Sequence, residues 1–164
     1  MKTNNIEDLY PLSPMQHGML FHSLYSPNSG MYFEQFICKI QDVNFEIDIF
    51  RSTWQQVLDR HGILRTAFVW ENVEEPLQFV RRYVEVPLNI FDWREKTETS
   101  QLSDLINYLQ IDRAQGFNLS KAPLMRLSLI RITDTNYYFI WSLHHILLDA
   151  WSISILLKEI IALY

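Results

Sequence analysis

The sequence has a single cysteine, Cys38, and only four glycines and six prolines in 164 residues. One cysteine cannot form a disulfide within the chain, which fits a reducing compartment such as the cytoplasm. The scarcity of glycine and proline, together with the absence of Ser-, Gln- or charge-rich tracts, excludes a linker or a low-complexity segment. The chain shows no internal repeat and no change of composition that would mark a domain boundary.

Basic residues and long apolar runs are also scarce. Fourteen Lys and Arg stand against nineteen Asp and Glu, a formal net charge of −5, so the chain lacks the clustered cations that neutralise phosphates and nucleic acid is not an expected partner. No stretch approaches the roughly 18 apolar residues of a membrane span. The opening MKTNNIEDLYPLSP lacks the basic start and apolar run of a secretory signal. We therefore expect a cytoplasmic protein without membrane association.

Hydrophobic residues make up 48% of the chain, enough for a sizeable core in one domain or one lobe of a larger domain. Apolar residues at helical spacing, with caps and glycine stops, predict helices at about 13–25, 45–60, 99–114 and 150–164. Runs rich in aromatic and β-branched residues predict strands at 31–40, 64–71, 76–83, 86–93, 123–132 and 136–146. Helices interleaved with hairpin-like strand pairs favour an α/β sandwich with a mixed sheet. In the third helix the expected buried face consists of Leu102, Leu105, Ile106 and Leu109.

Two adjacent histidines, His144 and His145, stand near the end of the last expected strand in LHHILLDAWS. Neighbouring side chains of an extended chain point to opposite faces, so one imidazole can enter the core while the other faces a cleft. Asp149 falls where the N-cap of the last helix belongs, and its carboxylate either caps that helix or accepts from an arginine. An imidazole titrates near pH 6.5 and is a suitable proton acceptor. On spacing alone, however, a buried histidine pair with an acidic cap explains the pattern better than a catalytic site.

Two other kinds of active site find no support in the sequence. The motif HExxH is absent, and His17, His22 and His61 show no ligand spacing, so no metal site is expected. GxSxG is also absent, which argues against a Ser-His-Asp hydrolase.

The whole chain resembles the amino-terminal lobe of condensation domains from nonribosomal peptide synthetases. Four segments carry the resemblance in order: YPLSPMQHGMLFHSLY at 10–25, RHGILRTAF at 60–68, GFNLSKAPLMRLSLIRI at 116–132 and HHILLDAWS at 144–152. The last is similar to the family motif HHxxxDG, with Ala150 in place of the glycine. The resemblance implies a chloramphenicol acetyltransferase-like fold in which residues 1–164 form the N-terminal lobe and the C-terminal lobe is absent. The end at IIALY, inside a helical pattern, fits a truncated domain.

The resemblance also implies an acyltransferase that joins aminoacyl or peptidyl thioesters through an amide bond. Its partners would be donor and acceptor peptidyl carrier proteins, the missing C-terminal lobe and an adenylation domain of the same assembly line. The carrier proteins would bear the 4′-phosphopantetheine, so no cofactor is expected on this chain. The first motif is similar to that of domains whose donor ends in a D-residue. The isolated lobe is expected to be inactive.

The same resemblance assigns roles to individual residues. His145 would take a proton from the acceptor amine or orient it, His144 would pack and form hydrogen bonds, and Asp149 would be structural. The expected arginine partners of Asp149 are Arg60 and Arg65 of the second motif. The expected tunnel-lining residues are Gln16, Ala150, Trp151 and Ser152. Ala150 either strains a position that requires a positive φ or simply opens the last helix, and the cap signal at Asp149 favours the second.

Three alternatives remain open on the sequence. An epimerisation domain shares HHxxxDG but acts at a Cα proton. An acyl-CoA-dependent O-acyltransferase of the same superfamily normally lacks the doubled histidine together with RHxxLRT. A non-catalytic carrier-docking lobe is the third alternative, and Ala150 in place of glycine keeps it open.

Overall fold

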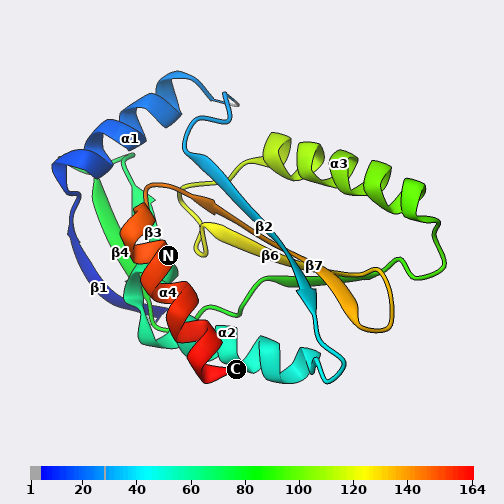
Figure 1. Cartoon of the computed structure of the whole chain (residues 1–164). Helices are drawn as coiled ribbons and strands as arrows, with labels where there is room; N and C mark the ends of the chain where they lie inside the picture. Colours follow the sequence, from blue (N-terminus) through cyan, green and yellow to red (C-terminus); the bar gives the residue numbers. More distant parts are fainter. Residues whose placement is uncertain (1–4, 28) are drawn as a thin grey trace.

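The computed structural model describes residues 5–27 and 29–164, and this part of the chain forms an α/β fold with two sheets (Figure 1). The helices are α1 (Pro14–Tyr25), α2 (Ile47–Arg60), the 3₁₀ helix η2 (Gly62–Arg65), α3 (Glu98–Gln115) and α4 (Ala150–Leu163). The strands are β1 (Ile6–Pro11), β2 (Phe33–Gln41), β3 (Thr66–Val69), β4 (Leu77–Arg81), β5 (Leu88–Asp92), β6 (Met125–Arg131) and β7 (Asn136–His144). The predicted α/β class with a mixed sheet is confirmed.

The larger sheet has the strand order β2-β7-β6-β5 and carries the histidine motif at the end of an inner strand. Strands β5 and β6 run parallel, whereas β7 is antiparallel to both β6 and β2. The register places Phe33 of β2 opposite His144 of β7. Because β7 is paired on both sides, its last residue is held by two neighbouring strands.

Helices cover both faces of this sheet. On one face, Trp54 of α2 packs its ring 5.7 Å from that of Phe139 and 5.1 Å from that of Trp141, both on β7. On the other face, Leu105 of α3 joins a smaller cluster with Ile140. Residues 139 and 141 therefore face α2 while residue 140 faces α3, as the two-residue period of a strand requires. None of the helices in the described ranges is long and apolar enough to cross a membrane.

The smaller sheet has the order β1-β4-β3, all antiparallel, and includes a strand that the sequence did not predict. Strand β1 reads IEDLYP and five of its six residues are exposed, so it lacks the alternation that signals a half-buried strand. It lies at the edge of the sheet and is held by its backbone pairing with β4. Strand β1 leads directly into α1, which begins at the predicted Ser13 cap with a capping box.

The buried face of α3 differs from the predicted one. Leu105 is buried, but Leu102 and Ile106 are 55% and 51% exposed. Two polar residues, Gln101 and Asp112, are buried in their place. Gln101 donates to backbone carbonyls and Asp112 accepts from the sheet, so hydrogen bonds rather than apolar contacts orient this helix.

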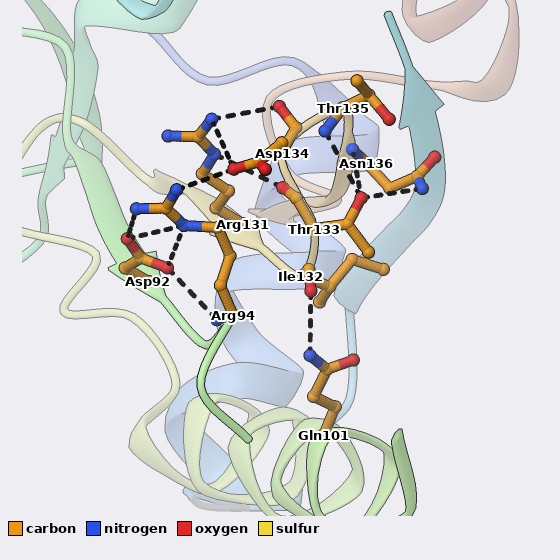
Figure 2. A network of polar contacts seen from close by, with 9 residues as sticks. All are labelled: Asp92, Arg94, Gln101, Arg131, Ile132, Thr133, Asp134, Thr135 and Asn136. Carbon is orange, nitrogen blue, oxygen red and sulfur yellow. Dashed lines mark hydrogen bonds and ion pairs between the residues drawn. The ribbon is translucent and has the colours of Figure 1, made fainter. Parts of the chain in front are cut away.

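A network of charged residues fastens the end of the sheet that lies farthest from the histidine motif (Figure 2). Arg94 pairs with Asp92 at 2.7 Å and with Asp134 at 2.8 Å, and its guanidinium lowers the pKa of Asp92 to about 2. Thr133 accepts from the backbone N–H of Asn136 and shapes the turn between β6 and β7. These groups are largely exposed, so we expect them to shape the hairpin more than they stabilise the fold.

Candidate active site

His144, the last residue of β7, is buried with 6% of its surface exposed. Its Nδ1 accepts from the backbone N–H of Ile146 at 3.2 Å, which places the proton on Nε2. Nε2 lies 3.4 Å from the hydroxyl of Ser23, and that hydroxyl donates to the carbonyl of Met19 at 2.7 Å. Burial, and to a smaller extent the neighbouring charge of His145, lowers the pKa of His144 to about 4. His144 is therefore a neutral residue that ties β7 to α1.

His145 follows on the opposite side of the chain and is only half-buried. Its backbone N–H donates to the carbonyl of Tyr32 at 2.7 Å, which fixes the loop after β7. Its Nδ1 is buried and has no hydrogen-bond partner within the described ranges. The residue lines an open pocket whose walls come from β1, α1, β4 and the start of α4. The structure thus separates the two histidines as the sequence predicted, one into the core and one toward a cleft.

The pocket includes polar groups that sequence reasoning selected and others that it missed. Gln16 and Ser152 line it, in line with their predicted place near the reaction site. Tyr10 and Gln78 also line it but were not selected from the sequence. A signal for Gln78 did exist, because a glutamine in the run LQFV interrupts an otherwise apolar strand and therefore needs a buried partner.

Asp149 is the N-cap of α4, as predicted, but it is not paired with an arginine. Its Oδ1 accepts from the backbone N–H of Ser152 at 2.8 Å, and hydrogen bonds from Ser152 lower the pKa of this exposed carboxyl. In residues 5–27 and 29–164 no ion pair joins Asp149 to Arg60 or Arg65, so the predicted pairing is wrong for this structure. The carboxylate is used by the helix terminus instead.

The two arginines of the second motif have different partners from those predicted. Arg65 is buried and holds the small sheet: its guanidinium contacts Glu7 at 2.6 Å, and it also donates to several backbone carbonyls, among them that of Leu58 at 3.1 Å. Arg60 is exposed and pairs with Glu159 of α4. The motif therefore links α2 both to β1 and to α4.

Two of the four residues predicted to line a tunnel do not line this pocket. Trp151 is 81% exposed, and Ala150 is also exposed. Ala150 is the first residue of α4 and does not belong to the described residues with a positive φ. Of the two explanations for alanine at this position, the structure confirms that it simply opens the helix.

The chemistry available at the pocket is that of a neutral base acting on a bound molecule. In the described part of the chain the ring of His145 forms no hydrogen bond to a serine, threonine or cysteine, so no side-chain nucleophile is poised beside it. No group of three or more His, Cys, Asp or Glu side chains within the same ranges could hold a metal ion. An imidazole in this setting can accept a proton from, or orient, a nucleophile that the substrate supplies.

Comparison with known proteins identifies the family. The family model described as the condensation domain matches residues 6–164. A linear gramicidin synthase protein of Brevibacillus parabrevis is 45% identical over 99% of this chain, which spans 2% of that protein. Bacitracin synthase 1 of Bacillus licheniformis is 40% identical over 97% of the chain and 3% of its own length. The chain therefore corresponds to a small part of these relatives.

Solved structures share the fold. The starter condensation domain of rhizomide synthetase superposes with a TM-score of 0.84 at 19% identity, over 96% of this chain and 39% of that chain. A four-domain nonribosomal peptide synthetase bound to AMP and glycine also gives a TM-score of 0.84, at 22% identity, over 96% of this chain and 12% of its own.

Proposed function

The chain belongs to the condensation-domain family, and we propose that it supplies the histidine that promotes amide formation between two carrier-bound acyl units. The observation that supports this most directly is the placement of His145. It lies at the end of an inner strand, half-buried, beside an open pocket and without a nucleophilic side chain attached to it.

In the proposed reaction the nucleophile is the α-amine of the acceptor. Its pKa is about 8, so much of it is protonated near neutral pH and it must lose a proton before it can attack. His145 accepts that proton or orients the free amine toward the donor thioester. The C–N bond forms as the C–S bond breaks, and the leaving thiolate takes up a proton. Because a thioester is already an activated acyl group, much of the rate enhancement can come from holding the two substrates together.

We also propose that residues 1–164 act as the N-terminal lobe of a longer condensation domain. The chain covers only 39% of the solved starter condensation domain that it matches. Its last helix presents large apolar side chains to solvent, among them Trp151 at 81%, Ile155 at 62% and Ile161 at 77% exposure. Such a surface suits a covering partner. Residues 1–164 alone should show no turnover of two loaded carriers, whereas the complete domain should.

The proposed partners follow from this reaction. Donor and acceptor carrier proteins present their substrates on 4′-phosphopantetheine, and an adenylation domain of the same assembly line loads them. We place the reaction in the cytoplasm, where the exposed thiol of Cys38 would stay reduced.

The test is reconstitution of the complete domain with two loaded carrier proteins. Transfer of the donor acyl group onto the acceptor amine, seen by mass spectrometry as a dipeptidyl carrier, is the expected product. Exchange of the donor Cα hydrogen without transfer would indicate epimerisation, and transfer from acyl-CoA to a hydroxyl would indicate an O-acyltransferase. Either result would overturn the proposal. Comparing D- with L-terminated donors tests the preference for a D-residue that the first motif suggests.

A further inference from the structure

Gln78 of β4 lies beside the pocket but belongs to no motif. Its side chain is buried, with 6% of the residue exposed, between the apolar residues of the small sheet. A buried amide is costly unless its donors and acceptor are satisfied, so its partners indicate what it holds in place.

The partners of Gln78 lead to α1. Gln78 Nε2 donates to Gln16 Oε1 at 3.0 Å, and Gln16 Nε2 donates to Gln78 Oε1 at 3.1 Å. The two amides therefore form a closed, reciprocal pair. Gln78 Nε2 also donates to the carbonyl of Pro11 at 3.0 Å, and Gln16 Oε1 accepts from the backbone N–H of Ser13 at 2.9 Å. Turning either amide over would bring oxygen against oxygen, so the orientation of both is fixed.

The pair reaches the loop that follows the histidines. Gln16 Nε2 lies 3.5 Å from the carbonyl of Ile146, the residue directly after His145. From the other side, the backbone N–H of His145 donates to the carbonyl of Tyr32 at 2.7 Å. The loop is thus held between the segment leading into β2 on one side and the glutamine pair on the other.

We propose that Gln78 is a positioning residue for His145, acting through Gln16 to set the place of the loop 145–148 against α1 and β1. The inference rests on the proposed function for its effect on turnover. It does not need that function for its effect on the surroundings of His145. Being buried, Gln78 offers little surface to a carrier protein, so its influence must pass through its hydrogen-bond partner.

The test uses the complete condensation domain with Gln78→Met, which removes the hydrogen bonds and keeps a side chain of similar length. We expect kcat for amide formation to fall about 10- to 100-fold, as a displacement of about 1 Å of a reacting group would cause. KM for the loaded acceptor carrier should stay within about twofold. The rate at which diethyl pyrocarbonate modifies His145, followed by peptide mass spectrometry, should rise several-fold as the loop loosens.

A matched control is Gln101→Met. Gln101 is also buried, at 8% exposure, and its amide donates to the carbonyls of Trp93 and Ile132 at 2.9 Å each, at the far end of the sheet (Figure 2). This variant should lose stability like Gln78→Met while leaving both kcat and the modification of His145 unchanged. Equal losses of kcat in the two variants would reduce Gln78 to a general structural role and overturn the proposal.

A double-mutant cycle with Gln16→Met checks that the two amides act as one unit. The double variant should then lose no more than about twofold beyond the more damaging single variant, whereas multiplied effects would contradict a shared role. If Gln78→Met does not fold, Gln16→Met alone decides, since it breaks the same link from the less buried side. A wild-type domain that forms no amide would refute the proposed function, while the modification rate of His145 would still test the positioning role.

Discussion

The two ends of β7 are built differently. At the Asn136 end, charged side chains pair with one another around the hairpin, as for Arg94 with Asp92 and Asp134. At the histidine end, one imidazole is enclosed and held neutral, and the next lies half-buried beside an open pocket. One strand therefore ends on one side in a set of satisfied surface charges and on the other in groups prepared to act on a bound molecule.

An unsatisfied atom does not by itself mark the functional end. Asn136 Oδ1 is also buried without a partner in the described residues, just as Nδ1 of His145 is. The difference is that an amide does not titrate, whereas an imidazole exchanges protons near neutral pH. Function is indicated where a titratable group, a pocket and an ordered loop coincide, and in the described residues this coincidence is found at the histidine end of β7.

The sharpest way to test this comparison is His145→Ala in the complete condensation domain. Amide formation should fall at least about a hundredfold, the lower range for losing a general base, while the melting curve stays close to that of the wild type. The exposed His17 on α1 provides the control, because His17→Ala should leave both quantities unchanged. Near-native turnover by a folded His145→Ala domain would end the catalytic assignment.

The neighbouring histidine should affect stability and its dependence on pH. Its pKa is about 4 in the folded chain and about 6.5 when unfolded, so below pH 6.5 the unfolded chain binds a proton that the folded chain does not. Stability should therefore fall by about 3 kcal/mol between about pH 6.5 and pH 4 through His144 alone. Urea unfolding of the wild type and of His144→Gln at pH 7 and pH 4.5 measures this. If both lose the same stability on acidification, His144 is not the group responsible.

Much of this site was predictable because it depends on local signals. The alternation of a strand separates His144 from His145, and an acidic residue before an apolar helical run indicates the cap at Asp149. Both signals lie within a few residues of the motif. The helices were predicted to within a few residues of their ends for the same reason, as Ser13 before α1 and Gly116 after α3 illustrate.

Contacts between distant segments were not predictable in this way. The partner of Arg65 is Glu7, from a strand whose exposed residues gave no strand signal, and the expected partner Asp149 is used by its own helix. The pairing of Gln16 with Gln78 spans 62 positions and depends on how two strands and a helix come together. Periodicity shows which residues share a face, but it does not show which segment that face meets.

At the opposite end of β7, Arg94→Met should have a small effect. The arginine is exposed and its ion pairs are screened by solvent, so we expect Tm to change by no more than about 2 °C and kcat to remain that of the wild type. A loss of turnover in this variant would show that the Asn136 end also contributes to function, and the contrast between the two ends would fail.

The smallest expected effect is that of Ala150→Gly, which restores the glycine of the family motif. Ala150 opens α4 directly after the Asp149 cap, is exposed, and is not among the described residues with a positive φ. Glycine there relieves no strain and adds freedom to the unfolded chain, so the variant should lose about 0.5 kcal/mol. Because the methyl group does not line the pocket, kcat should be unchanged. Thermal unfolding and turnover of the complete domain measure both. A higher Tm would mean that alanine strains the turn, and a changed kcat would mean that position 150 senses the substrate after all.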